Sequence, residues 1–306
     1  MLRYIVTRAI ASLPVLFVIS LAAFALMHIA PGDPVAFMLG RNAPPEAYER
    51  TRKDLGLDKP LPVQYWIFLS SVAKGQMGQS LIYRVPTRDL IFQRLPKTLL
   101  LSVLALIVCY LIAIPIGVLA AVKRGSAIDF GVMAGATLGI SIPSFWLGLI
   151  LIMVFAVKLR WLPASGHEGL KVLILPVFTL AIGEAAVVAR LIRSSMIESL
   201  GGDYVRTARA KGLNNFRVIF VHALRNAMLP TISVLGLQLG FLLVSTVVVE
   251  NVFGWPGVGR LLVESISRRD YPVVQGTLLV LGVTIVLGNL IADVLYRVAN
   301  PQIRYV

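Results

Sequence analysis

The sequence predicts an all-α membrane protein with six transmembrane helices, and three observations support this fold class. Of the 306 residues, 57% are apolar and only 14% are charged, against about 25% in an average soluble domain. A soluble fold of this length needs more polar residues to cover its surface. The apolar residues also gather in stretches of about 20 or more, enough for a helix to cross a bilayer. Because backbone amides in lipid must bond within their own element, we expect helices at about 9–30, 98–122, 130–157, 172–195, 229–249 and 273–296.

The distribution of basic residues predicts the orientation of these spans. The net charge is +14, from 29 basic and 15 acidic residues, an excess that in a soluble protein would suggest nucleic-acid binding. Cytoplasmic loops of membrane proteins are enriched in Lys and Arg, which offers another explanation. With the N-terminus inside, the short outside loops hold only Lys158, Arg160, Lys171, Arg260, Arg268 and Arg269. We therefore expect both termini in the cytoplasm (N-in/C-in), a lipid bilayer around the chain and no nucleic-acid partner.

Residues 1–94 form the first predicted block, which is one span followed by an external cap segment. The apolar stretch is longer than that of a signal peptide and no small-residue cleavage site follows it, so we expect an uncleaved anchor. The motif Pro31-Gly32-Asp33-Pro34 must turn the chain. A polar helix is expected from Pro45 to Leu57 and an amphipathic, aromatic piece around Val63–Val72. These regular features favour an ordered cap over a disordered loop.

Residues 95–298 form the second block, which is five spans with mostly short connections. The connection at 196–228 is long and strongly basic, and it is expected in the cytoplasm. The loop at 250–272 is expected on the outer side.

Motifs for catalysis are absent from the sequence. There is no Gly-x-x-x-x-Gly-Lys-Ser/Thr phosphate loop, so the chain has no recognisable means of binding ATP through that motif. His167-Glu168 lacks the second histidine of a zinc protease, and the three histidines lie far apart in the sequence. The only cysteine, Cys109, lies within a span and has no disulfide partner. We therefore predict a non-catalytic chain with no metal site and no cofactor of its own.

The most informative stretch is the loop between the fourth and fifth spans, where the sequence predicts a short helix at about 204–211. Asp203 is suited to cap its first amides, and Gly212 is suited to end it in a left-handed conformation. Asn214 or Asn215 would then cap a second helix.

An isolated helix of this length is marginal in water, so it must pack on something. Val205 and Ala208 share one face, while Arg206, Arg209 and Lys211 mark a basic side. The residues alone leave two interpretations open. The helix is either a rigid plug for a groove on a partner protein or part of a solvated basic loop without a partner.

This loop resembles the signature loop of permeases from ATP-binding cassette (ABC) importers. The family pattern is Glu-Ala-Ala, three residues, Gly, nine residues, Ile-x-Leu-Pro. In this chain Arg206-Thr207-Ala208 stands at the first triplet, Gly212 at the glycine and His222-Ala223-Leu224-Arg225 at the last four positions. The Glu and the final Pro are missing, and this variant is similar to the dipeptide, oligopeptide and nickel branch of the family.

Further motifs, in the same order along the chain, are similar to that branch and extend the resemblance over nearly the whole length. They are Pro31–Pro34, Gly56–Asp58, Ser141–Phe145, Glu250–Pro272 and Asn300–Tyr305. The chain thus resembles a type I ABC importer transmembrane domain, and it also resembles glutathione-import permeases.

The resemblance implies a permease subunit of the bacterial inner membrane that forms half of a pathway for short peptides or peptide-like solutes such as glutathione. It implies a complex with a second homologous permease, two ABC ATPases that bind ATP and Mg²⁺, and an extracytoplasmic substrate-binding protein. In that family the short helix is the coupling helix, which docks on an ATPase. The coupling residues implied here are Asp203, Tyr204, Arg206, Thr207, Ala208, Arg209, Lys211, Gly212 and Asn215.

The sequence leaves three other functions open. Import of a nickel complex is the alternative within the family. An ion-coupled secondary transporter with Glu184 and Asp293 as proton sites is the alternative from another class, because ionisable residues within spans are functional candidates. The third is a membrane scaffold that only recruits partners.

Candidate pathway residues lie within the spans. Ser141 and Ser144 flank Pro143, which interrupts the third span because its missing N–H frees a helix carbonyl. Glu184 either lines the pathway or anchors a contact between helices. Gln238 is a further candidate, of a residue type that also forms interhelical hydrogen bonds.

The external loop 250–272 has two compatible interpretations. It is a gate or docking surface for a substrate-binding protein, through Glu250, Trp255, Arg260 and Asp270. It is also expected to form an interfacial hairpin, anchored by the aromatic rings of Trp255 and Tyr271.

Overall fold

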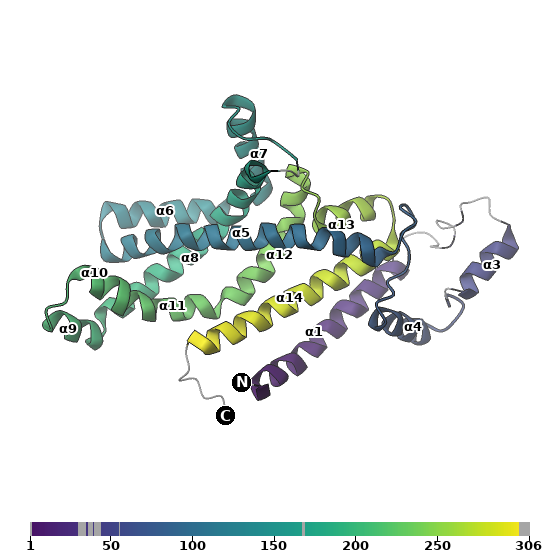
Figure 1. Ribbon diagram of the computed structural model, residues 1–306, viewed down its shortest axis with the longest axis horizontal. Coiled ribbons are helices and arrows are strands. Elements are labelled where there is room, and N and C mark those ends of the chain that lie inside the picture. Colours follow the sequence, from purple (N-terminus) through teal and green to yellow (C-terminus); the bar gives the residue numbers. More distant parts are fainter. Residues whose placement is uncertain are drawn as a thin grey trace. The chain divides into compact units, whose positions relative to one another are not determined.

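The backbone is helical along most of the chain that the computed structural model describes, which is residues 2–29, 35, 39, 44–54, 56–166 and 169–299. Three segments of the sequence considered above for their motifs lie outside the described residues, namely Pro31–Pro34, His167-Glu168 and Asn300–Tyr305. Within the described part there is no β-strand, and an isolated antiparallel bridge pairs Gln79 with Pro86. In chain order (Figure 1), the helices are α1 (Leu2–Ile29), α3 (Pro45–Asp54), α4 (Leu61–Ala73), α5 (Thr87–Val122), α6 (Ala127–Ser141), α7 (Ser144–Leu151), a π-helical segment (Ile152–Lys158), α8 (Leu170–Gly201), α9 (Asp203–Ala210), α10 (Asn215–Arg217), a second π-helical segment (Val218–Ala223), α11 (Leu224–Ser233), α12 (Leu235–Phe253), α13 (Val258–Ser267) and α14 (Tyr271–Ala299).

Five described helices are long and apolar enough to cross a membrane, namely α1, α5, α8, α12 and α14. The third predicted span is not one straight helix, because α6 and the segment Ser144–Lys158 are bent by 102° at a short break. Ile142 is extended there, with φ −84° and ψ 120°, since the residue before a proline disfavours the helical conformation. Counting the bent pair as one span gives up to six. The count of six and the N-in/C-in orientation stay predictions.

The fifth span begins later than predicted. α12 starts at Leu235, and Pro230 lies inside the preceding helix α11 instead of at the start of the span. Val234 separates the two helices with φ −93° and ψ 0°. This conformation departs from that of a regular helix and ends α11.

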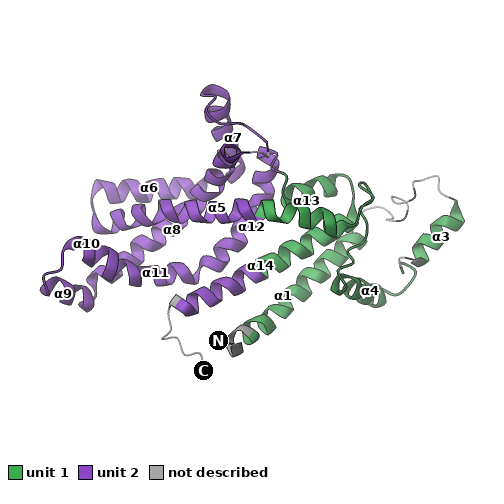
Figure 2. Ribbon diagram, in the orientation of Figure 1, with its two compact units in different colours: residues 1–98, 256–286 green, residues 99–255, 287–306 purple. Residues whose placement is uncertain are grey.

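The chain divides into two compact units (Figure 2). Unit 1 comprises residues 1–98 and 256–286, and unit 2 comprises residues 99–255 and 287–306. The predicted division after residue 94 stays a prediction. Residues 256–286 lie in the second predicted block but group with residues 1–98 in unit 1. Apolar side chains explain this, because those of α13 and early α14 form one buried cluster with Ile91 of α5. Two of the three boundaries, at 98/99 and 286/287, fall inside the long helices α5 and α14, and the third, at 255/256, lies between α12 and α13.

The cap segment is ordered against the first span within unit 1. The ring centroid of Phe24 lies 5.3 Å from that of Tyr65 and 5.8 Å from that of Phe68. Tyr65 OH and Ser20 Oγ lie 2.7 Å apart, within hydrogen-bonding distance. α3 and α4 match the two helical pieces expected in the cap. Aromatic packing of α4 against α1 therefore orders this part of the cap.

α8 forms the centre of the core of unit 2. Val188, Ile192 and Met196 are fully buried and belong to a cluster that also holds Cys109 of α5. α5 approaches α8 closely at Gly117, where a Cβ atom would lie 2.8 Å from the Ala189 carbonyl oxygen. Because the Ala189 carbonyl belongs to the backbone, it cannot rotate away from a side chain at position 117 as another side chain could.

Gly117→Ala is therefore expected to lower the free energy of unfolding by about 1–3 kcal/mol, since overpacking must separate the two helices. The measurement is thermal unfolding of the purified chain in detergent. Gly131→Ala in α6 is the matched control, because nothing lies within 4 Å of a Cβ at that position, and alanine favours a helix interior. Equal melting temperatures for the two variants would contradict the close approach.

Candidate functional site

The loop predicted to couple the chain to an ATPase folds into α9, which follows directly after α8. The N-cap of α9 is Gly202 and makes no side-chain hydrogen bond, so the predicted capping by Asp203 is wrong. Asp203 is instead the first helical residue. A carboxylate at this position still stabilises the helix, because it lies near the positive end of the helix dipole. Its Oδ1 lies 3.5 Å from Arg206 Nη1. Both side chains are exposed, so this pair contributes little to stability.

α9 ends as its glycine predicts. Gly212 has φ +77°, its N–H donates to the Arg209 carbonyl at 2.9 Å, and the Leu213 N–H donates to the Ala208 carbonyl at 3.3 Å. These two bonds form a Schellman motif, which satisfies the last carbonyls of a helix. Asn214 then caps α10, with its Oδ1 accepting from the Arg217 N–H at 2.9 Å, while Asn215 is the first residue of that helix.

The apolar face of α9 packs on its own chain. Val205 is fully buried, Ala208 is 4% exposed, and both share a core cluster with Ile192 and Met196 of α8. This contact supplies the stability that eight residues lack in isolation. Ala208 is thus absent from the face left for a partner. That face consists of exposed side chains, which are Asp203, Tyr204, Arg206, Thr207, Arg209, Ala210 and Lys211.

Tyr204 fixes the join between α8 and α9. Ser199 Oγ at the end of α8 donates to the Ala223 carbonyl at 2.7 Å and lies 2.5 Å from Tyr204 OH. Because a serine hydroxyl carries one proton, Tyr204 OH is the donor in the second bond. A Cβ on Gly202 would lie 2.7 Å from Tyr204 Cε1, so the ring needs the glycine beside it. Three helical segments are held together by these contacts.

An exposed aromatic pair beside α9 was not singled out from the sequence. The ring centroids of Phe216 and Phe220 lie 4.7 Å apart, and the two residues are 67% and 42% exposed. Together with the basic side chains of α9 they give the end of unit 2 that carries α9 and α10 (Figure 1) an aromatic and cationic surface. Aromatic residues and arginine are enriched in protein interfaces. Their spacing of four residues in a helical stretch is the signal that could have found them.

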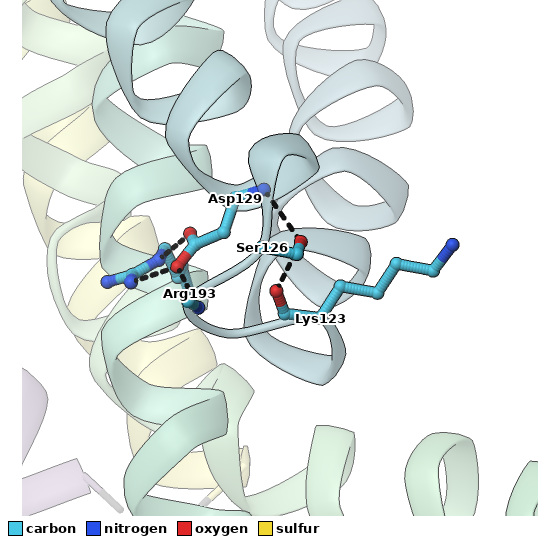
Figure 3. A network of polar contacts seen from close by, with 5 residues as sticks. Lys123, Ser126, Asp129 and Arg193 are labelled. Carbon is cyan, nitrogen blue, oxygen red and sulfur yellow. Dashed lines mark hydrogen bonds and ion pairs between the residues drawn. The ribbon is translucent and has the colours of Figure 1, made fainter.

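A bidentate ion pair joins α6 to α8 and was also missed (Figure 3). Arg193 Nε donates to Asp129 Oδ1 at 2.5 Å, and Arg193 Nη2 donates to Asp129 Oδ2 at 2.7 Å. The Gly125 N–H donates to the same Oδ2 at 3.0 Å. Ser126 Oγ accepts from the Asp129 N–H and donates to the Lys123 carbonyl. The pattern Ser-x-x-Asp is a capping signal in the sequence, but the partner 64 residues away is visible only in the fold.

The candidate pathway residues divide into two sets. Ser144 and Glu184 line one cavity of about 70 Å³ within unit 2. Ser141 Oγ instead donates to the Thr137 carbonyl at 2.9 Å. Gln238 is buried, and its Oε1 accepts from Tyr110 OH at 2.8 Å. Gln238 therefore makes the interhelical hydrogen bond that the sequence left as an alternative.

Three of the four candidate gate or docking side chains lie inside the fold. Glu250 and Asp270 are fully buried and Trp255 is 4% exposed. Arg260 is more accessible, and its Nε donates to Glu264 Oε1 at 2.8 Å. The loop is also not a simple hairpin, because α13 occupies its centre. Buried residues of this kind shape the loop, which leaves Arg260 as the accessible member of the set.

Asp270 holds a loop of the cap. Its Oδ2 accepts from Ser80 Oγ at 2.5 Å, and its Oδ1 accepts from the Leu81 N–H at 3.1 Å. Asp270→Ala is expected to lower the free energy of unfolding by about 2 kcal/mol, because a buried hydroxyl and amide lose their acceptor. Thermal unfolding and limited proteolysis around residue 81 measure the change. Ser267→Ala, on an exposed side chain, is the control; matching effects of the two substitutions would refute the assignment.

Two family descriptions match the sequence. "Binding-protein-dependent transport system inner membrane component" matches residues 113–305, and the N-terminal family of the same transport-system components matches residues 1–102. The chain is 44% identical over 305 residues to the glutathione transport system permease protein GsiC of Escherichia coli, with 100% of both chains covered. It is 43% identical to GsiC of Shigella boydii, over the same length and coverage.

Solved structures share the fold. An inward-facing structure of the MetNI methionine ABC transporter aligns with a TM-score of 0.58 at 22% identity, over 69% of this chain and 96% of that chain. A structure of an amino acid ABC transporter with histidines aligns with a TM-score of 0.51 at 19% identity, over 75% and 97%.

Proposed function

The chain belongs to the family of binding-protein-dependent transport system inner membrane components, and from that premise we propose how it works. It is a permease subunit of an ABC importer for peptide-like solutes and a multi-pass protein of the bacterial inner membrane. α9 carries the proposal. It is a short helix seated on the core by one face, with a basic face exposed.

The basic face of α9 is proposed to dock on a cytoplasmic ATPase. Arg206, Arg209 and Lys211 are exposed, so their charges are available to a partner. The positive-inside rule favours the cytoplasm for this loop. The chain has no phosphate loop of its own, so ATP and Mg²⁺ would bind in the partner ATPases, and this chain would have no catalytic role. α9 would follow an ATPase movement as a rigid body because its buried face is packed.

The proposed solute is glutathione or a short peptide. The full-length match to GsiC proteins supports this solute class. We further propose a second, homologous permease that completes the pathway, two ATPases and an extracytoplasmic substrate-binding protein. A nickel complex is the alternative solute.

Uptake by the reconstituted complex tests the function. This chain, its partner permease, the ATPases and the binding protein are placed in liposomes, and entry of labelled glutathione is followed with ATP or with a proton gradient alone. Uptake is expected only with ATP and all subunits. Gradient-driven uptake by this chain without an ATPase would establish a secondary transporter instead. ATP-driven entry of a nickel complex, without entry of peptides, would reassign the solute and keep the coupling.

A further inference from the structure

A small cavity in unit 2 gathers polar side chains from three helices. Ser144 of α7, Glu184 of α8 and Ser245 of α12 line it, and its volume is about 70 Å³. None of these three side chains makes a hydrogen bond or ion pair with another residue that the structure describes. Thr179 also lines the cavity, but its hydroxyl donates to the Leu175 carbonyl. The three side chains are only partly buried, so their polar atoms remain open to a ligand that enters the cavity.

The break between α6 and α7 adds a backbone acceptor to this cavity. Pro143 has no N–H, so the Gly139 carbonyl four residues earlier loses its helical donor. That carbonyl oxygen lies 4.0 Å from the Cβ position of Gly183 and so faces α8, and both glycines line the cavity. The C-terminal end of α6 also carries a partial negative charge from its unsatisfied carbonyls.

These groups define the chemistry of a ligand. A carboxylate, a freed carbonyl and two hydroxyls are acceptors, and no basic side chain lines the cavity. An ammonium group has three donors and one positive charge, which matches this set. The volume suits a group of a few heavy atoms, since one water occupies about 30 Å³ in the liquid. A whole dipeptide does not fit.

We propose that this cavity binds the primary ammonium group of the transported solute, with Glu184 as its counter-charge and with Ser144, Ser245 and the Gly139 carbonyl as further acceptors. The assignment rests on the proposed import of peptide-like solutes. The rest of the solute would lie outside the cavity. A solute without a free amino group would gain nothing from this site.

Charge-selective labelling tests the cavity without any transport. Ser245→Cys is made in a Cys109→Ala background, which removes the only native thiol of this chain, and this chain's labelling is followed when the intact complex is reacted with methanethiosulfonate reagents. The ethylammonium reagent is expected to react about 10-fold faster than the ethylsulfonate reagent, because the Glu184 carboxylate attracts the cation. Adding Glu184→Gln is expected to lower this rate ratio toward one.

Glu198→Gln is the matched control, because it removes the same charge from an exposed position on the same helix, α8. This substitution is expected to leave the ratio of rates unchanged. If Glu184→Gln leaves the ratio of the two labelling rates unchanged, the proposal is overturned. Failure of both reagents to label Cys at position 245 would also overturn it, because a solute site must be accessible.

A second measurement asks whether the solute uses the cavity. Uptake of glutathione and of N-acetylglutathione is compared between Glu184→Gln and wild-type complexes, so that any preference of the binding protein cancels in each mutant-to-wild-type ratio. We expect glutathione uptake to fall about 10-fold and uptake of the acetylated form to change by less than about 2-fold. Equal losses for both solutes, or no loss for either, would contradict the proposal. If the wild-type complex imports neither form, the proposed solute is wrong, while labelling still decides whether the cavity prefers cations.

Discussion

Gly212→Pro is expected to abolish ATP-driven uptake and to weaken association with the ATPases by at least about 10-fold. Gly212 has φ +77°, whereas proline fixes φ near about −65°. Proline also removes the N–H that donates to the Arg209 carbonyl. The last turn of α9 would therefore unwind, and Leu213 would leave the core. Co-purification of the ATPases and uptake into proteoliposomes measure the two losses.

Gly169→Pro is the control for the backbone strain that proline causes at a glycine with positive φ. Gly169 has φ +87° with nothing within 4 Å of a Cβ, and it stands at the opposite end of α8. Its substitution is expected to lower thermal stability but to leave ATPase association intact. Arg206→Glu combined with Arg209→Glu then tests the surface alone, because both side chains are exposed and the fold should persist. Normal association in that double variant, together with normal association in Gly212→Pro, would refute α9 as the coupling element.

Asp129→Ala is expected to lower the free energy of unfolding by about 3 kcal/mol, because it leaves the Arg193 guanidinium partly buried without its counter-charge. The side chains of Arg193 and Asp129 are 23% and 7% exposed, so water compensates little. α6 would also lose its fixed position on α8, and uptake is expected to fall with it. Thermal unfolding in detergent and uptake in proteoliposomes provide the measurements.

A double-mutant cycle with Arg193→Met separates the pair from its surroundings. The double variant is expected to recover part of the loss, with a coupling energy of about 1.5–3 kcal/mol. Arg190→Met is the comparison, because Arg190 is exposed on α8 and donates to Thr137 Oγ1 at 3.2 Å, which is a hydroxyl and not a carboxylate. Additive losses at Asp129 and Arg193 would show that the ion pair contributes nothing of its own.

The sequence predicted those features that depend on local chemistry. The lengths of the apolar stretches predicted the positions of the long helices, and Gly212 predicted where α9 ends. Pro143 indicated an interruption, although not its angle, because a proline frees a carbonyl without fixing where the next helix goes. Asp203 misled because the N-cap position fell one residue earlier, on Gly202, and helix ends are set by tertiary packing as well as by propensity.

Features that depend on distant contacts could not be predicted from one sequence. The Asp129–Arg193 pair, the seating of Val205 on α8 and the burial of Asp270 against Ser80 each join segments that no local pattern connects. The candidate pathway residues were predicted in a similar way, only because they are polar or ionisable residues within predicted spans. In the fold, Ser144 and Glu184 line the same cavity, whereas Gln238 accepts a hydrogen bond from Tyr110.

One uninterrupted helix, α8, connects the cavity with α9. α8 runs from Glu184 to Gly201 without a proline and without a glycine before its last residue, a length of about 26 Å at ~1.5 Å per residue. This part of α8 has no hinge residue at which the helix could bend and so uncouple the movements of its two ends. Closure of the ATPases and release of the ammonium group would then occur in one concerted kinetic step. An intermediate with the ATPases closed and the solute still held in the cavity would not accumulate.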